Sequence, residues 1–133
     1  MSTAPVQTLS ISIERPFATV YEFLAIPENF PRWASGLASG LNRVNDEWIA
    51  QTPEGPLRVK FTAHNPFGVA DHYVVPESGS SIYIPMRVIA NGSGSELIFT
   101  LFRQPDMSDE KFAADAAWVR RDLQTLKELL EAE

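Results

Sequence analysis

The chain has 133 residues with a formal net charge of −6 and an isoelectric point of about 4.9, and it contains no cysteine. The acidic balance argues against a nucleic-acid or anionic-membrane partner, because both attract basic surfaces. No apolar run approaches the length that a bilayer requires, and the absence of cysteine excludes disulfides, thiol nucleophiles and thiolate zinc sites. The length of the chain predicts one domain over residues 1–133. We expect it in the cytoplasm, since the first residues lack the features of a secretory signal.

The first part of the chain predicts a strand followed by two short helices. Apolar and polar residues alternate over 7–14, as in a half-buried strand. Pro16 suits the first turn of a helix, and apolar residues recur at helical spacing over 16–25. Pro27 and Pro31 punctuate a second short helix. Helices this short are marginal in water, so packing must hold both.

The middle of the chain predicts an antiparallel meander. Each turn carries Gly, Pro or Asn, which permit tight backbone angles. The predicted strands cover 41–44, 47–51, 57–64, 69–75, 82–90 and 96–103. Their regular spacing indicates one curved antiparallel sheet of six to seven strands when the first strand is included.

The last segment predicts one long amphipathic helix from Ser108 to about Leu130. Asp109 and Glu110 lie in its first turn, where they favour the helix dipole. A continuous apolar stripe follows, formed by Phe112, Ala116, Val119, Leu123, Leu126 and Leu130. The order of strand, helix pair, strands and long helix predicts a sheet that grips the last helix over an apolar cavity.

The chain resembles the SRPBCC superfamily, which includes START domains, birch-pollen-allergen proteins and bacterial polyketide cyclase/dehydrase-like proteins. The resemblance is carried by the opening strand, by Arg15-Pro16 with Val20-Tyr21-Glu22-Phe23-Leu24, and by Pro27-Glu28-Asn29-Phe30-Pro31-Arg32-Trp33. It extends over the whole chain, and the segments 67–72 and 99–105 are typical of small bacterial members.

This resemblance implies an α+β helix-grip fold, with two short helices after the first strand and a long C-terminal helix packed across the sheet. Members bind lipids, sterols, polyketides or plant hormones in a cavity between the sheet and that helix. Some members catalyse cyclisation, dehydration or ring hydroxylation. The chain has no Rieske-type Cys/His pairs, so an oxygenase catalytic subunit of the superfamily is excluded.

Two histidines are the only candidates for acid–base chemistry near neutral pH. A four-residue turn over 65–68 would set Phe61 opposite His72, and residues opposite one another share a face of the sheet. We therefore expect His72 to face the cavity and His64 to face water. Asp71 then points to the other face, so Asp71 and His72 cannot form a dyad.

The register beyond this hairpin conflicts with the apolar pattern. Carried forward unchanged, it would push the apolar residues of the next two strands into solvent as a large patch. Pro85 is the expected sign of an irregularity, because proline cannot donate to a strand ladder. We expect a shift between residues 76 and 85 that keeps His72 and the apolar residues inside. It would leave Arg87 outside, near Asp71.

The leading hypothesis is a binding module for a small hydrophobic or amphipathic ligand, such as a lipid, in a cavity between the sheet and the last helix. Sites of this kind are apolar pockets with a few placed polar groups. The candidate ligand-binding residues are Trp33, Phe61, His72, Met86, Phe99, Phe112 and Val119. Trp33 is expected near the cavity entrance.

Two alternatives remain open. One is a polyketide cyclase/dehydratase-like enzyme that uses His72 as general acid or base, helped by Tyr73 or Tyr83. The other is an interaction protein that forms a homodimer through its sheet or last helix. We expect no cofactor, and two histidines without carboxylates at ligand spacing do not predict a metal site. Neither nucleic-acid binding nor membrane insertion is expected.

Overall fold

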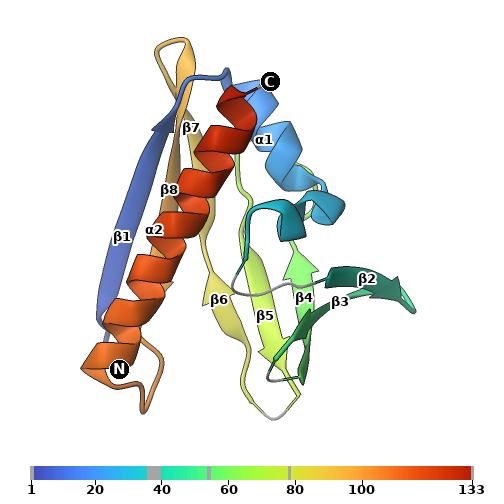
Figure 1. Ribbon diagram of the computed structural model, residues 1–133, viewed down its shortest axis with the longest axis vertical. Helices are drawn as coiled ribbons and strands as arrows, with labels where there is room; N and C mark the ends of the chain where they lie inside the picture. Colours follow the sequence, from blue (N-terminus) through green and yellow to red (C-terminus); the bar gives the residue numbers. More distant parts are fainter. Residues whose placement is uncertain (1, 36–39, 54, 78, 133) are drawn as a thin grey trace.

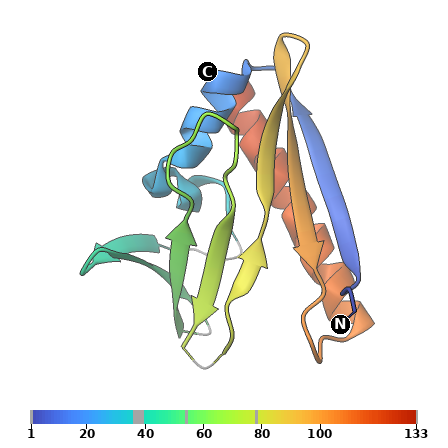
Figure 2. The same ribbon diagram turned by 180° about the vertical axis from the view of Figure 1, so that it is seen from behind.

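The computed structural model describes residues 2–35, 40–53, 55–77 and 79–132, and it has the predicted α+β helix-grip architecture (Figure 1). The elements in chain order are β1 (Val6–Ile13), α1 (Phe17–Ala25), η1 (Pro27–Arg32), β2 (Gly40–Val44), β3 (Glu47–Thr52), β4 (Gly55–Phe61), β5 (His72–Pro76), β6 (Ile82–Ile84), β7 (Met86–Asn91), β8 (Gly94–Phe102) and α2 (Asp109–Glu131). Figure 1 shows α2 running across one side of the strands, and Figure 2 shows those strands from the opposite side.

The described strands form two antiparallel sheets rather than the single sheet of six to seven strands expected from the sequence. Their orders are β1-β8-β7 and β2-β3-β4-β5-β6. The strand expected over 82–90 is divided at Pro85 into β6, which pairs with β5, and β7, which pairs with β8. Proline has no N–H to donate, so the ladder cannot pass through this position. The predicted irregularity is therefore a division of the sheet.

The hairpin before this division has the predicted register but is shorter than expected. Phe61 pairs with His72, as predicted, but β4 ends and β5 begins at this pair. The loop between them turns away and binds β7 instead. Val88 N donates to Gly68 O over 2.9 Å, and Ala70 N donates to Met86 O over 2.8 Å. Gly68 has φ +74°, and a Cβ there would lie 2.3 Å from Val88 O, so this approach requires glycine.

A buried carboxylate holds the chain together at the division. Asp71 Oδ1 accepts hydrogen bonds from the Met86 amide over 2.9 Å and from Arg87 Nε over 2.8 Å. Its Oδ2 accepts bonds from a terminal guanidinium nitrogen of Arg87 and from the Tyr83 hydroxyl, both over 2.8 Å. The expected proximity of Arg87 and Asp71 is confirmed. Asp71 is covered by these partners rather than exposed to water.

The pKa of Asp71 reflects opposing effects. Burial alone would raise this pKa, but the hydrogen bonds from Arg87, Tyr83 and Met86 and the charge of Arg87 outweigh burial and lower it below its usual value. Asp71 is therefore a charged acceptor that joins the segment before β5 to the residues on both sides of Pro85.

The two halves of α2 pack differently. Ser108 caps its start, because the Ser108 hydroxyl accepts a hydrogen bond from Lys111 N over 3.1 Å. Leu123, Leu126 and Leu130 in the C-terminal half are 2% exposed or less. In the N-terminal half Ala116 is also buried, but Phe112 and Val119 are only half-buried, so the predicted apolar stripe is not covered along its whole length.

We expect Leu123→Ala to lower the free energy of unfolding by about 2–5 kcal/mol, the usual result of removing a fully buried leucine side chain. Chemical denaturation of the two proteins measures the change. Gln124→Ala, at the exposed neighbouring position, is the matched control and should change stability by no more than about 0.5 kcal/mol. Equal, small effects of both changes would contradict the buried position of Leu123.

Asp71→Asn should lower stability at pH 7 by about 1–3 kcal/mol, because it weakens a charge-assisted network while leaving Arg87 in place. The folded-state pKa of Asp71 is depressed, so its stabilisation is present above the unfolded pKa of 3.8 and is lost as the pH falls through the lower folded value. Denaturation curves from pH 7 to pH 2 test both statements. A variant as stable as the parent at pH 7 would contradict them.

Candidate functional site

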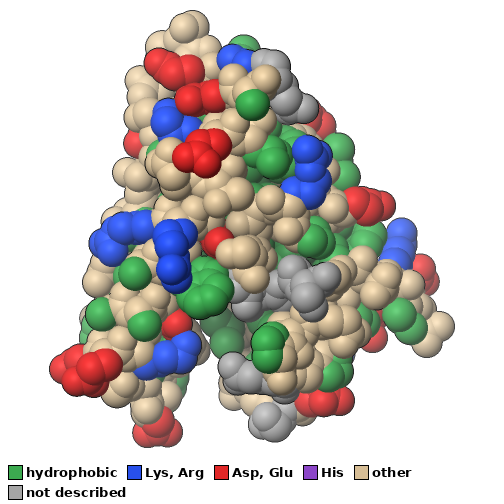
Figure 3. Space-filling view, viewed as in Figure 1, with side chains coloured by type: hydrophobic (Ala, Val, Ile, Leu, Met, Phe, Trp, Pro, Cys, Tyr) green, Lys and Arg blue, Asp and Glu red, His purple; other side chains and the backbone are tan. Residues whose placement is uncertain are grey.

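A pocket of about 730 Å³ lies between the inner face of β4, β5 and β6, the end of β8 and the N-terminal half of α2. In Figure 3 the surface is hollowed between the lower part of α2 and the strands, with hydrophobic side chains in the hollow. The walls are mainly apolar, and include Val74 and Ile84 from the larger sheet and Phe99 and Leu101 from β8. The half-buried Val119 faces this pocket, which explains why the α2 stripe is incompletely covered there.

The pocket exists where the two sheets separate. Thr100 N donates to Pro85 O over 3.1 Å, and beyond this bond β6 pairs with β5 whereas β8 pairs with β1. Residues of both β6 and β8 line the pocket, including Ile82 and Phe102. The division at Pro85 therefore supplies one side of the site.

His72 lies in the pocket wall at the start of β5. It is 3% exposed and pairs across the sheet with Phe61 and Ile84. Its ring centroid lies 5.4 Å from that of Phe30 and 6.0 Å from that of Phe61. Nδ1 is 3.4 Å from the Ala70 carbonyl oxygen, which favours the tautomer with a proton on Nδ1. Burial lowers the pKa of His72 to about 4, so the imidazole is neutral at pH 7.

The structure brings only part of the predicted ligand-binding set together. Trp33, His72, Phe99 and Val119 line the pocket. Three other predicted residues lie elsewhere: Phe61 packs behind His72 and against Trp48, Met86 is 1% exposed in the core beyond Pro85, and Phe112 is half-buried on α2. The alternation of residues along a strand predicts which face of the sheet a side chain lies on. It does not predict whether that side chain lines the pocket or packs in the core.

The tyrosines expected to assist His72 lie on the other side of the sheet. Tyr73 and Tyr83 stack on one another at 5.1 Å between ring centroids, and Tyr83 stacks on Phe102 at 6.1 Å. Tyr83 reaches the edge of the pocket, but its hydroxyl donates to Asp71. This arrangement gives neither hydroxyl a hydrogen bond to the His72 imidazole.

Sequence reasoning missed a buried acid in the pocket wall. Asp122 on α2 is 9% exposed and lines the pocket. Its Oδ1 accepts hydrogen bonds from the Ser35 hydroxyl over 2.6 Å and from Ser35 N over 3.3 Å. A signal was present, because Asp115 and Asp122 stand seven positions apart, flank Val119, and therefore share its face of the helix.

His64 lies outside the pocket, exposed to water as predicted. Its Nε2 is 2.7 Å from Glu22 Oε2, and both side chains are more than half exposed. It takes no part in the site.

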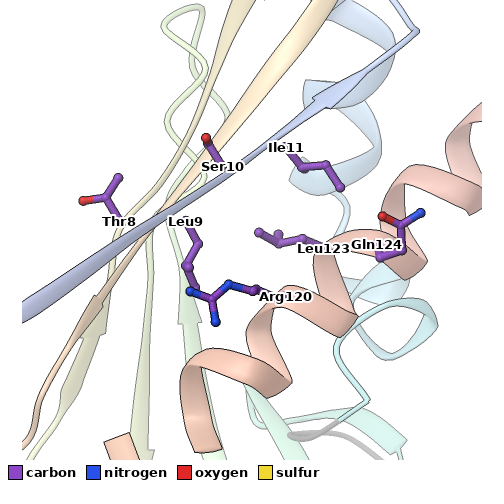
Figure 4. Close-up of a pocket in the computed structure, with 7 residues that line it drawn as sticks. All are labelled: Thr8, Leu9, Ser10, Ile11, Arg120, Leu123 and Gln124. Carbon is purple, nitrogen blue, oxygen red and sulfur yellow. The ribbon is translucent and has the colours of Figure 1, made fainter. Parts of the chain in front are cut away.

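A second hollow of about 400 Å³ lies between β1 and α2 (Figure 4). Thr8, Ser10, Arg120 and Gln124 surround it. Arg120 is tied to β1 by a 3.2 Å hydrogen bond from its guanidinium to Gln7 Oε1. These four side chains are exposed, whereas the apolar Leu9, Ile11 and Leu123 also line the hollow, so it is a surface groove with both polar and apolar walls.

Within the described ranges, no group of three or more His, Cys, Asp or Glu side chains could hold a metal ion. The helices described in the same ranges are too short or too polar to cross a bilayer.

The buried, neutral state of His72 predicts a specific pH dependence of stability. Its folded-state pKa lies near 4, below the ordinary value of 6.5. The neutral imidazole should therefore contribute fully to the free energy of unfolding above pH 6.5. This contribution, up to about 3 kcal/mol, should be lost as the pH falls towards 4. Denaturation at pH 7 and pH 4 should show a smaller loss for His72→Leu than for the parent. Equal losses would contradict the burial of a neutral imidazole.

The comparisons with known proteins find similarity in structure alone. No family model matches the chain, and no curated protein matches it. An uncharacterised protein from Bacillus thuringiensis superposes with a TM-score of 0.76 at 12% identity, covering 95% of this chain and 98% of that one. A START superfamily protein from Mycobacterium smegmatis gives 0.70 at 12%, covering 96% and 97%. The Aha1 dimer from Colwellia psychrerythraea gives 0.72 at 17%, covering 96% of each chain. These similarities show that the chain has the SRPBCC-type helix-grip fold.

Proposed function

We propose that the protein binds a small hydrophobic or amphipathic molecule in the pocket between the sheets and α2. The observation that carries this proposal is the pocket itself, with a volume of about 730 Å³ and mainly apolar walls. Small-molecule sites typically enclose about 300–1,000 Å³ and carry a few placed polar groups. His72 and Asp122 are such groups here. The absence of cysteine in the chain also supports our proposal of a cytoplasmic location.

The incomplete burial of the pocket walls supports a binding role. Leu101, Ile82 and Val119 are half-buried, and Trp118 is 46% exposed, although all four line the pocket. A ligand with an apolar body would remove this surface from water, which is the main driving force of apolar binding.

The chemistry of His72 favours recognition over catalysis. A general base works best with a pKa near the operating pH, and burial holds the pKa of His72 at about 4. Its nearest rings are Phe30 and Phe61, and Asp71 binds Arg87 on the opposite face. With Nδ1 directed to Ala70, Nε2 is the hydrogen-bond acceptor that His72 offers to a ligand.

Filling the pocket should weaken binding. We expect Leu101→Trp to weaken binding of Nile red, an uncharged apolar dye, by at least about tenfold, because the larger side chain would occupy ligand space. A fluorescence titration measures the affinity, and a denaturation curve confirms that the variant folds.

Ile89→Trp is the matched control for this experiment. Ile89 is 50% exposed on β7 and does not line the pocket, so its replacement by the same residue should leave the affinity unchanged. If the parent failed to bind the dye, or if both variants lost affinity equally, the proposed site would be wrong.

A further inference from the structure

The two ring nitrogens of His72 have different surroundings. Nδ1 lies 3.4 Å from the carbonyl oxygen of Ala70, and the Ala70 N–H is itself bound to Met86 O in β7, which fixes this carbonyl in place. Over residues 2–35, 40–53, 55–77 and 79–132, no buried side-chain nitrogen or oxygen lacks a hydrogen-bond partner, and Nε2 of His72 has no partner in these ranges. Nε2 is therefore accessible rather than sealed in the core, and the space beside His72 is the pocket.

The imidazole lies among apolar and aromatic side chains. Phe30 and Phe61 are its neighbouring rings, Phe30 packs edge-on against Trp33 at 5.5 Å between ring centroids, and Ile84 lies opposite His72 on β6. Burial holds the pKa of His72 at about 4, so Nε2 carries a lone pair rather than a proton at pH 7. A hydrogen bond is stronger in such apolar surroundings than in water, and a missing one costs more.

Two donor side chains of the pocket are already used within its wall. The Tyr83 hydroxyl donates to Asp71, and the side-chain amide of Gln104 donates to Phe102 O. An apolar molecule that fills the pocket would exclude water from His72 and leave Nε2 without a donor. The ligand itself must then supply that donor.

We propose that the ligand is an uncharged molecule with a hydroxyl group that donates a hydrogen bond to His72 Nε2, and that His72 selects such molecules over those without a donor. This inference rests on the proposed function and extends it. A carbonyl, ether or carboxylate oxygen would need the imidazole proton on Nε2, and the Nδ1 lone pair would then face the Ala70 oxygen. A charged ammonium group could donate, but its burial beside Phe30 and Phe61 would cost far more than that of a hydroxyl.

Two isomers test the inference on the folded protein, because they have the same composition and differ in the hydroxyl. Decan-1-ol and methyl nonyl ether would each be titrated at pH 7, below their solubility limits, against protein with bound Nile red. We expect the alcohol to displace the dye at a concentration about tenfold lower than the ether, since the ether leaves Nε2 without a donor. Equal displacement, or better displacement by the ether, would overturn the inference.

His72→Leu should remove the advantage of the alcohol, because leucine accepts no hydrogen bond. A change in pocket shape alone would affect both isomers and leave their ratio unchanged. His64→Leu is the matched control, the same replacement at the exposed histidine outside the pocket, and should keep the ratio of the parent. If His72→Leu kept the advantage of the alcohol, or if His64→Leu also lost it, the role of His72 would be wrong.

Nitrogen NMR of the imidazole rings tests the same bond in the parent protein, and it decides the matter should His72→Leu not fold. The chain has two histidines, so His64 serves as an internal control. Decan-1-ol should move the His72 Nε2 signal to lower frequency, as expected when a nitrogen lone pair accepts a hydrogen bond, and should leave the His64 signals unchanged. An unmoved Nε2 signal at saturating alcohol would refute the hydrogen bond.

The outcomes separate this inference from the proposed function. If the dye, the alcohol and the ether all fail to bind, the pocket is not a binding site and both proposals fail. If the alcohol and the ether displace the dye equally, the pocket binds apolar molecules and only the inference fails.

Discussion

The hydrogen bonds onto the Asp71 carboxylate are the interaction on which the rest of the structure depends. Pro85 interrupts the strand that would otherwise join the two sheets, and the next amide, Met86 N, is satisfied by Asp71 rather than by a neighbouring strand. Arg87 and Tyr83 bind the same carboxylate from both sides of the interruption. Because the buried charge of Asp71 is fully paired, these bonds fix the break between β6 and β7 in one position. A sheet closed at this point would leave no gap between β6 and β8.

The two halves of α2 have different roles as a result. Where the three-stranded sheet is continuous, Leu123, Leu126 and Leu130 pack into the core and anchor the helix. Where the sheets separate, the helix instead presents Val119 and Asp122 to the pocket. One stretch of regular helix thus provides both stability and one wall of the proposed binding pocket. Substitutions at the half-buried Val119 should therefore alter binding in the proposed pocket more than stability.

Much of the fold could be predicted from the sequence because it depends on local patterns. The loop length before His72 set the Phe61–His72 pair, and Pro85 marked the irregularity, since both follow from backbone geometry. The proximity of Arg87 to Asp71 was also predicted, but the division into two sheets was not, because it depends on the bond from the Met86 amide to Asp71 and on the pairing of the Gly68 loop with β7. The same limit applies to the site. Inward alternation placed Met86 inside, but only the three-dimensional packing shows that core fills the space around it.

We propose that the space between the divided sheets and α2 is a binding site for an apolar molecule. Methyl NMR during titration with dodecan-1-ol tests it most directly, because methyl groups report their surroundings one by one. Binding in the pocket should shift the methyl signals of Ile82, Ile84, Leu101 and Val119, which line it, and leave those of the exposed Ile89 and Val44 unchanged. Unchanged pocket methyls at saturating alcohol, or shifts confined to Ile89 and Val44, would contradict it.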